Sequence, residues 1–486
     1  MAARDSAAIA GGVSEAVLVE RAGGAVARGA RRLLGGAYGR RVVIVCGKGN
    51  NGADGRVAGQ RLARWGARVD RFDLAGIELP QLDRALGRAD LAVDAMFGTG
   101  FRGPLVGDAA VAADALTAAA CPVLAVDIPS GVDGLTGAAR GTAVEAQATV
   151  CLVALKPGLV FFPGAALAGE VEVADIGIDP STPPPSLSLT EEADLAAWLP
   201  RRAPESHKWS VGGVYVVGGS QGMTGAVMLS SRAALRAGAG IVVAGLPGEA
   251  AARASGGEVI TRSLPATSSG ALDEGAAKEV LDGLDRFRAL IVGPGLGQAP
   301  ATVAAVRRLV AEAPIPLVLD ADGLNALDGD LDLLAGRPAA TVVTPHAGEY
   351  ARLAGEPVGE DRVAAARRLA ERAGAVVLLK GSRTVVADPT GRAAVNPTGG
   401  PWLATAGTGD VLSGIVGALA AVGLPAFRAA AAGAWLHGRA ADEAGHAGLV
   451  AGDLIDALPI VLAGLAAPAG HDARPPNHPN RSNRAR

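Results

Sequence analysis

The sequence of 486 residues predicts an α/β protein with two three-layer αβα domains. Along both halves, short Val- and Ile-rich runs alternate with Gly-rich turns and Ala-rich helical segments, which is the pattern of parallel βα units. Hydrophobic residues make up 49% of the chain but aromatic residues only 3%. The cores must therefore be built from Ala, Val and Leu, as when helices pack closely on parallel strands. The length also exceeds that of one ordinary domain of about 150 residues.

The predicted domain boundary lies near residue 185, within the segment DPSTPPPSLSLTEEADLAAWLPRR (179–202). Its proline run cannot join a helix or a central strand, and Thr190 followed by two glutamates predicts a helix start. The last residues are rich in Pro, Asn and Arg without apolar periodicity, which is typical of disorder. The expected parts are an N-terminal domain (1–180), a linker (181–199), a C-terminal domain (200–466) and a disordered tail (467–486).

Composition limits the partners and the location. The net charge of −3 gives no general attraction to nucleic acid or to acidic membranes. The N-terminus lacks the basic start and apolar core of an export signal, and no apolar run reaches the ~18 residues of a membrane span. Cys46, Cys121 and Cys151 lie in or beside apolar runs and not at metal-ligand spacing, so we expect buried, reduced thiols. The sequence predicts a cytoplasmic protein that acts on small molecules. We expect neither nucleic-acid nor membrane partners. The sequence does not decide whether the protein forms a homo-oligomer.

The first strand, turn and helix lie in RRVVIVCGKGNNGADGRVAGQRLARWGARVDRFD (40–73). A G-x-G-x-x-G pattern is formed by Gly47, Gly49 and Gly52. Asp70 lies near the distance where a ribose-binding acid is expected, so the pattern alone is compatible with a nicotinamide-dependent dehydrogenase. Asn50, Asn51 and Asp54 instead fill the turn with side-chain amides and oxygen ligands. A purely structural alternative is that the asparagines adopt the left-handed conformation of the turn.

Two later strands also end in polar residues. ADLAVDAMFGTGFRGP (89–104) ends an apolar run at Asp94, and CPVLAVDIPSGVDGLTG (121–137) ends another at Asp127, with Ser130 three residues later. Ligands of open parallel sheets bind at the carboxyl ends of the strands. Each residue alone could cap a helix. Together with the Asn51 turn they predict a polar pocket, in which oxygen donors suit a hard cation.

The segments GKGNNGADG, VDAMFGTGFRGP and DIPSGVDG resemble those of the NAD(P)H-hydrate epimerase family, which has a Rossmann-like fold, over residues 1–180. The resemblance implies that Asn51, Asp94 and Ser130 bind a potassium ion (K+), and that Asp127 binds substrate and acts in catalysis. Ala53 stands where the family usually has glycine. The implied substrate-binding residues are Asn50, Asn51, Gly52, Ala53, Asp54, Gly98, Thr99, Gly100, Phe101, Arg102, Gly103, Pro104 and Asp127.

The epimerisation that this resemblance implies suits a catalytic carboxylate. A hydrated nicotinamide carries a hydroxyl at C6 beside the ring nitrogen, and its loss as hydroxide leaves an iminium cation to which water can add on the other face. A carboxylate such as Asp127 can stabilise that cation and handle the proton. No nucleophile or redox group is required.

The second half restarts the strand and turn pattern with VYVVGG (214–219). In LLKGSRT, Lys380 and Thr384 surround a glycine at a strand end, where a cation and a hydroxyl can meet the phosphates of a nucleotide. The order and spacing of a P-loop are absent. His346 precedes Glu349 after a strand; its own segment favours a structural role, whereas the neighbouring loops favour a site.

Two further acids end another strand of this half. Asp320 and Asp322 could bind Mg2+ through water, and a helix cap is an equal alternative for Asp322.

The segment ATAGTGDVLSGIVGALA (404–420) places an acid at the start of a predicted helix, where free N–H groups favour anions. AGTGD before a helix resembles the anion hole and catalytic aspartate of the ribokinase-like fold. In that arrangement the N–H groups of Gly407, Thr408 and Gly409 face the transferred phosphoryl group, and Asp410 activates the hydroxyl that accepts it.

A finer resemblance, over about residues 200–465, is to the nucleotide-dependent (S)-NAD(P)H-hydrate dehydratase family, through HKW, GGSQGMTGA, GPGLG, TPHAGE, KGSRT and AGTGDVLSG in order. It implies phosphorylation of the C6 hydroxyl by ADP or ATP, with Mg2+, and elimination of phosphate to restore NAD(P)H. Asp410 would be the catalytic residue. The implied hydrate-binding residues are Ala226, Gly295, His346 and Asp410, and the nucleotide-binding residues are Lys380, Gly381, Ser382, Arg383, Thr384 and Gly409.

Both resemblances point to one pathway, so the sequence predicts a bifunctional nicotinamide-nucleotide repair enzyme, an isomerase fused to a lyase. The main alternative is a ribokinase-like small-molecule kinase with an accessory Rossmann-like domain, which would leave a stable phosphorylated product instead of free phosphate. A dehydrogenase would need no adenine nucleotide. A non-catalytic binding protein would give Asp127 and Asp410 no reason to lie among glycine turns.

Overall fold

The computed structural model describes residues 2–182, 184–254 and 257–466. The chain divides into two compact units, one formed by residues up to 189 with 345–397 and the other by 190–344 with the residues from 398 onwards. Strands assemble into a six-stranded and a ten-stranded sheet, with helices between most of them. The predicted α/β class is confirmed, and the predicted tail (467–486) lies outside the described residues.

The first sheet has the order β2-β1-β3-β4-β5-β6, and all neighbouring strands are parallel. Its central strands are short apolar runs that are buried on both faces, as in β1, where every residue after Arg41 is buried. The strands are β1 (Arg41–Cys46), β2 (Arg68–Asp73), β3 (Leu91–Ala95), β4 (Val123–Val126), β5 (Ala148–Leu152) and β6 (Glu170–Ala174).

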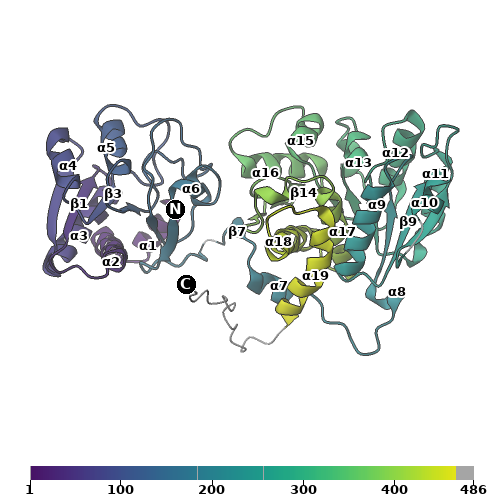
Figure 1. The fold of residues 1–486 in the computed structure, drawn as a ribbon, viewed down its shortest axis with the longest axis horizontal. Helices are drawn as coiled ribbons and strands as arrows, with labels where there is room; N and C mark the ends of the chain where they lie inside the picture. The colour runs from purple at the N-terminus through teal and green to yellow at the C-terminus, as the bar shows by residue number, and fades with distance from the viewer. Residues whose placement is uncertain (1, 183, 255–256, 467–486) are drawn as a thin grey trace, which may run out of the picture. The chain divides into compact units, whose positions relative to one another are not determined.

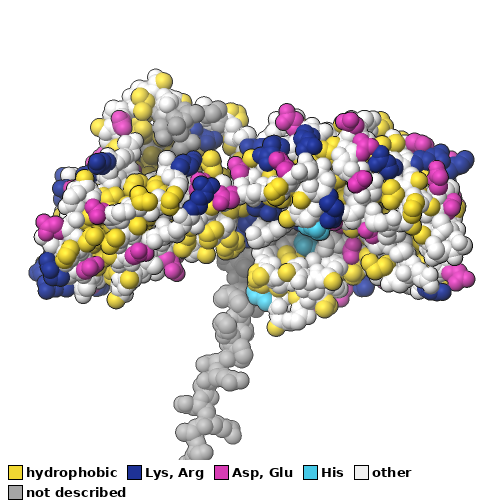
Figure 2. Space-filling view, turned by 90° about the horizontal axis from the view of Figure 1, so that it is seen from above, with side chains coloured by type: hydrophobic (Ala, Val, Ile, Leu, Met, Phe, Trp, Pro, Cys, Tyr) yellow, Lys and Arg dark blue, Asp and Glu magenta, His cyan; other side chains and the backbone are white. Residues whose placement is uncertain are grey.

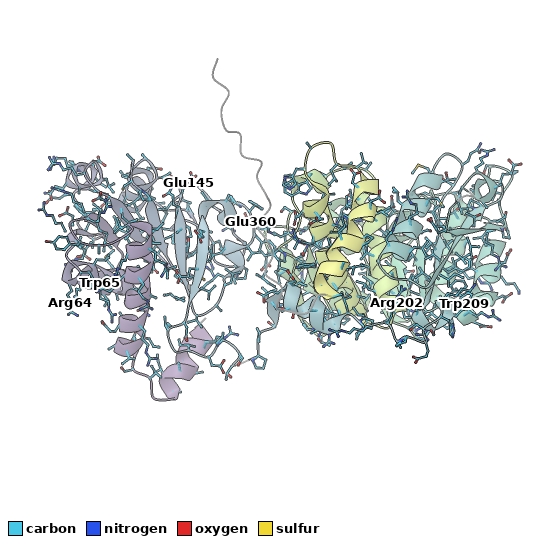
Figure 3. The ribbon with its side chains drawn as sticks, turned by 60° about the horizontal axis from the view of Figure 1, so that its bottom comes forward. Arg64, Trp65, Glu145, Arg202, Trp209 and Glu360 are labelled. Atoms are coloured by element: carbon cyan, nitrogen blue, oxygen red, sulfur yellow. The ribbon has the colours of Figure 1, made fainter. Side chains whose placement is uncertain are left out.

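Helices cover both faces of this sheet. Ile44 of β1 packs in the core that contains α2 and α3, whereas its neighbour Val43 packs with α4 and α5. Figure 1 shows these two helix pairs on opposite sides of the strands, which makes three layers. Trp65, labelled in Figure 3, follows α3, and the Arg31 guanidinium lies 5.5 Å from the centre of its ring. The helices are α1 (Ala2–Ala10), α2 (Glu15–Leu33), α3 (Asn50–Arg64), α4 (Leu79–Leu86), α5 (Asp108–Thr117) and α6 (Gly164–Leu167), with the short η1 (Pro157–Leu159).

The second sheet has the order β10-β9-β8-β11-β12-β13-β14-β15-β16-β7. The strands from β10 to β12 are parallel to their neighbours, but β14, β15 and β16 pair antiparallel. The five residues 380–384 between β14 and β15 are too few for a crossover helix, so these two strands form a hairpin. The strands are β7 (Leu187–Leu189), β8 (Gly213–Val217), β9 (Ile241–Pro247), β10 (Ile260–Leu264), β11 (Ala289–Val292), β12 (Leu317–Leu319), β13 (Thr341–Val343), β14 (Val376–Leu379), β15 (Val385–Ala387) and β16 (Ala393–Val395).

The apolar helix α17 is held tightly in its unit. It packs on α9 so closely that a Cβ atom on Gly414 would overlap the Ser230 carbonyl oxygen, and it also contacts β8, β11 and β12. The helices of the second half are α7 (Glu192–Trp198), α8 (Lys208–Val211), α9 (Thr224–Arg236), α10 (Ala250–Ala254), α11 (Gly275–Asp282), α12 (Pro300–Glu312), α13 (Asp322–Asn325), α14 (Asp332–Ala335), α15 (Ala347–Ala354), α16 (Arg362–Ala373), α17 (Thr408–Ala421), α18 (Ala426–Ala444) and α19 (Ala451–Ala466), with η2 (Leu284–Arg286) and η3 (Pro401–Leu403).

Residues 181–199, the expected linker, contain β7, which pairs with β16, and α7. The predicted helix start is confirmed, because α7 begins at Glu192 with Glu191 as its N-cap. All three cysteines are buried and free, as expected.

The surface shows no strong segregation of charge on the face in view, where basic and acidic side chains are interspersed (Figure 2). Among the described helices, none has both the length and the apolar character needed to cross a membrane.

Candidate active sites

A cavity of about 1010 Å³ lies within the N-terminal part, at the carboxyl ends of β1, β3, β4 and β5. This edge is where parallel sheets bind ligands, and the volume suits a molecule of nucleotide size. Helices α1 and α2 add an apolar wall that includes Leu18. The predicted residues that line the cavity are Asn50, Asn51, Asp54, Gly98, Thr99, Gly100, Phe101, Arg102 and Asp127.

Four predicted substrate residues, Gly52, Ala53, Gly103 and Pro104, are not among the residues that line this cavity. Gly52 has a backbone reason to be glycine, since a Cβ atom there would overlap the Gly47 carbonyl oxygen. Ala53 lies in the first turn of α3, where its N–H donates to the Gly49 carbonyl at 3.1 Å. The alanine methyl group therefore fits a regular helical turn.

Asp94 and Ser130 contact each other, and neither is among the residues that line the cavity. The Asp94 carboxylate accepts hydrogen bonds from the Ser130 N–H and Oγ–H, both at 2.7 Å, and from the Met96 N–H at 3.1 Å. Asp94 is completely buried, and burial raises its pKa to about 6 although the Ser130 and Met96 hydrogen bonds oppose the shift. Burying an ionised carboxylate is unfavourable, and a nearby cation would offset this free energy.

Asn51 lies at the edge of the cavity with an unsatisfied amide group. Its side-chain nitrogen is buried and has no hydrogen-bond partner among the described residues. Its oxygen faces the Gly98 loop, where a Cβ atom built on Gly98 would lie 3.3 Å away. A buried polar atom without a partner is unfavourable unless a ligand or water satisfies it.

Asp127 follows β4 in an unusual backbone conformation, with φ of +68°, which is uncommon for a residue other than glycine. Such strain is tolerated when the surroundings hold the residue in place, and it occurs often at functional sites. The Asp127 N–H donates to the Val150 carbonyl at 2.8 Å, and Oδ1 accepts from the Leu152 N–H at 3.2 Å. The β4 and β5 pairing thus fixes this carboxylate at the cavity wall.

Lys156 is a charged residue of this cavity that the sequence motifs did not reveal. Only 4% of it is exposed, and its ammonium group pairs with Asp127 Oδ1. A lone lysine in the apolar stretch VALKPGL is the signal that could have found it, because buried lysines need a partner.

Asp54, on α3, brings a second carboxyl group into the cavity. It is 5% exposed, and burial, with a smaller contribution from the Asp127 charge, raises its pKa to about 8. The site can therefore hold a protonated carboxyl group at neutral pH.

In the second half, α17 begins at Thr408, within the segment AGTGD where a helix start was predicted. Gly407 is the N-cap residue, with φ of +87°, and Asp410 lies in the first helical turn, partly exposed. The ring of His437, from α18, lies 2.9 Å from the Thr408 carbonyl oxygen through Nε2 and is largely buried. No sequence motif identifies His437, which contacts the backbone of the first turn of α17.

The structure brings two other predicted hydrate-binding residues together. Gly295 has φ of +68°, and a Cβ atom there would lie 3.2 Å from the Ala226 side chain at the start of α9. The Gly295 carbonyl accepts a hydrogen bond from Ser220 Oγ at 2.9 Å. These contacts require a residue without a side chain at position 295.

His346 has a clear structural role as the N-cap of α15. Its Nδ1 accepts from the N–H groups of Gly348 at 2.9 Å and Glu349 at 3.2 Å, while Glu349 accepts from the His346 N–H at 2.8 Å. This is a capping box. Because Nδ1 is an acceptor, Nε2 carries the proton, and the side chain is still 55% exposed. Nε2 lies 3.5 Å from Oε1 of Glu349, so the same acid faces the ring nitrogen that does not take part in capping.

The predicted nucleotide loop is the turn of the β14–β15 hairpin. Lys380 lies 3.6 Å from the buried Glu349 carboxylate, so the helix cap and the loop share one acidic residue. A Cβ atom on Gly381 would overlap the guanidinium of Arg362, which also donates to the Lys380 carbonyl at 3.0 Å. Arg362 was not identified from the sequence; its burial lowers its pKa.

The proposed Mg2+ acids have protein partners. Asp322 accepts from the Gly297 N–H at 2.8 Å and from the Gln298 side chain at 3.2 Å, so it orders the GPGLG loop. It lies inside α13, and the N-cap position belongs to Ala321. Within the described ranges, no group of three or more His, Cys, Asp or Glu residues could hold a metal ion.

Both halves of the chain are similar to known proteins. The family described as NAD(P)H-hydrate dehydratase matches residues 214–459, and the family described as YjeF-related protein N-terminus matches residues 15–83 and 75–158. The "Bifunctional NAD(P)H-hydrate repair enzyme Nnr" of Moorella thermoacetica is 43% identical over 92% of each chain, and that of Mycobacterium tuberculosis (strain H37Rv) is 42% identical over 82% of each chain. A ribokinase-like superfamily protein from Enterococcus faecalis, 23% identical, covers 58% of this chain and 98% of its own with a TM-score of 0.50, which supports the fold of the second half.

These findings define a two-part α/β enzyme with a ribokinase-like second half. The chain belongs to the family of bifunctional NAD(P)H-hydrate repair enzymes. The family and enzyme class predicted from the motifs are confirmed.

Proposed function

We propose that this chain repairs hydrated NADH and NADPH in two steps. Its N-terminal part interconverts the R and S hydrates, and its C-terminal part dehydrates the S form at the expense of ADP or ATP. One observation supports the proposal most strongly: a single chain of this family contains both a carboxylate, Asp127, that lines a cavity of about 1010 Å³ and a helix, α17, that begins after a glycine N-cap with Asp410 in its first turn. An epimerase in the same chain makes both hydrates available to a dehydratase that accepts only one.

In the epimerase step, Asp127 faces the nicotinamide ring. Loss of hydroxide from C6 leaves an iminium cation, which the fixed, buried carboxylate stabilises, and water returns to the other face. Asp54, which holds its proton at neutral pH, can donate that proton to the departing hydroxide, and the Asp127 carboxylate can accept the proton that is released when water adds to the other face. The apolar wall from α2 can pack against the substrate and orient the ring.

The same site fits a K+ ion. Asp94 and Ser130 offer oxygen donors, and the Asn51 amide lacks a partner and can present its oxygen after rotation. Hard cations prefer such oxygens. A bound cation would balance the Asp94 charge and help to order the Gly98 loop, since Ser130 Oγ also accepts from the Phe97 N–H at 3.0 Å.

In the dehydratase step, the oxygen of the C6 hydroxyl attacks the terminal phosphoryl group of the nucleotide, and Asp410 accepts the proton of that hydroxyl. The N–H groups of the first turn of α17 stabilise the transferred group, and the helix dipole favours the negative charge. We assign the Lys380 loop to the nucleotide phosphates and His346 Nε2–H to the hydrate. Elimination of phosphate then restores the reduced ring. Mg2+ would arrive with the nucleotide, since it usually keeps phosphates and waters among its ligands.

The test uses an equal mixture of R and S hydrates with ADP or ATP. We expect full recovery of reduced-nicotinamide absorbance and one inorganic phosphate released for each molecule restored. A stable phosphorylated product without recovered absorbance would instead indicate a kinase and contradict the proposal.

A further inference from the structure

Lys156 forms a buried contact and lies outside the three segments that carry the resemblance to the epimerase family. It follows β5, and its Nζ donates to Asp127 Oδ1, to the Leu152 carbonyl at 2.6 Å and to Cys151 Sγ at 3.5 Å. An ammonium group with this little exposure is costly to bury, so the fold gains something specific by keeping it.

The contacts of Asp127 divide its two carboxylate oxygens between different tasks. Oδ1 is held by the Lys156 ammonium and the Leu152 N–H. Oδ2 points towards the glycine loop of the cavity, where a Cβ atom built on Gly98 would lie 3.5 Å from it. No hydrogen bond to Oδ2 occurs within the part of the chain that the structure describes. One oxygen is thus anchored, and the other is presented to the cavity.

We propose that Lys156 is a positioning residue for Asp127 in the epimerase step. By holding Oδ1, it fixes the carboxylate plane at a strained backbone position, so that only Oδ2 meets the nicotinamide ring. Positioning of this kind acts on the rate of the chemical step more than on substrate affinity. The inference rests on the proposed function, because it assumes that Asp127 acts on the hydrate.

The experiment follows exchange between purified R and S hydrates without nucleotide, so that the dehydratase is idle, by chromatographic separation of the epimers. Lys156→Met keeps the length of the side chain and removes the charge. We expect kcat for exchange to fall by about 100-fold with KM changed less than about threefold. Lys278→Met, at an exposed lysine of the second half, is the matched control and should exchange at the wild-type rate.

A double-variant cycle distinguishes positioning from an independent role. If Lys156 acts through Asp127, then Lys156→Met in an Asp127→Asn background should cost no further rate. A Lys156→Met enzyme with wild-type kcat would overturn the inference. A second loss of about 100-fold in the double variant would also overturn it, because the two residues would then act separately.

Lys156→Ala gives a second measurement if the methionine variant is unstable. Because Lys156 lines the cavity, methylammonium can enter the space left by the truncated side chain, and we expect it to raise exchange at least tenfold, whereas methanol should not. Absence of such rescue, or loss of the folded N-terminal part in both variants, would assign Lys156 to stability alone. A wild-type chain without exchange above the spontaneous rate would contradict the proposed function instead.

Discussion

The two sites each depend on one aspartate, but the protein holds the two residues differently. Asp127 is buried, lies at a strained backbone position and pairs with Lys156. Asp410 is partly exposed in the first turn of α17, beside Gly407 and Gly409. The comparison suggests that a reaction with one substrate and a cationic intermediate favours a fixed, enclosed charge. A phosphoryl transfer between two substrates favours an accessible acid next to backbone donors.

The largest expected effect separates the two aspartates. Asp410→Asn should lower the nucleotide-dependent dehydration of the S hydrate by about 10³-fold, since a general base contributes about 10²–10⁴ to such steps. Exchange between R and S hydrates should stay at the wild-type rate in the same preparation. Equal losses in both reactions would show that the two sites are not independent.

Gly407 tests whether the backbone at the start of α17 is as important as the acid. Its φ is +87°, and a Cβ atom would lie 2.7 Å from Leu229 Cδ1, so Gly407→Ala should destabilise the fold by about 2 kcal/mol. The temperature of thermal unfolding and the kcat of the dehydratase reaction would both fall. Gly452→Ala is the control, since nothing lies within 4 Å of a Cβ atom there. Unchanged unfolding in Gly407→Ala would mean that the turn relaxes without strain.

Asp54 tests how the buried carboxyl group makes the free energy of unfolding depend on pH. Burial and the Asp127 charge raise its pKa from 3.8 to about 8, so the folded state favours the protonated form. The resulting stability is present below pH 3.8 and is lost as the pH rises towards about 8. Between pH 6 and 8 the free energy of unfolding should fall by about 1–2 kcal/mol, and Asp54→Asn should remove most of this fall. Asp282→Asn, at an exposed acid, should leave it unchanged. Parallel pH curves for wild type and Asp54→Asn would contradict the shifted pKa.

His346 allows a capping role to be separated from a ligand contact. Loss of the N-cap in His346→Ala should cost about 1 kcal/mol, whereas His346→Asn keeps an acceptor for the Gly348 and Glu349 N–H groups and should be close to wild type in stability. Both variants lack Nε2–H, so both should raise KM for the hydrate. A wild-type KM in His346→Asn would leave capping as the only role of this residue.

Strand ends were predictable from the sequence because apolar runs followed by Gly, Asp or Ser have a distinct physical meaning. The meeting of Asp94 with Ser130 follows from neighbouring parallel strands, whose carboxyl ends share one edge. A motif does not, however, distinguish a residue that contacts a ligand from one that shapes the backbone. Gly52 was therefore predicted to bind substrate, although it is needed because a Cβ atom at this position would overlap the Gly47 carbonyl oxygen.

Contacts that depend on side chains far apart in sequence could not be predicted. Lys156 reaches Asp127 only because β4 and β5 pair in one register, which a single sequence does not specify. Likewise, Val385–Ala387 is too short to be identified as a strand by periodicity, so the sequence predicts a strand end at Lys380 but not the hairpin.

An equal mixture of R and S hydrates with nucleotide measures whether one chain contains two separable activities. The wild-type protein should restore all of the reduced-nicotinamide absorbance in one fast phase. Asp127→Asn should restore half of it at the wild-type rate and the rest at the slow rate of spontaneous epimerisation. Full recovery by Asp127→Asn in a single fast phase would contradict the account, because the carboxylate would then have no part in epimerisation.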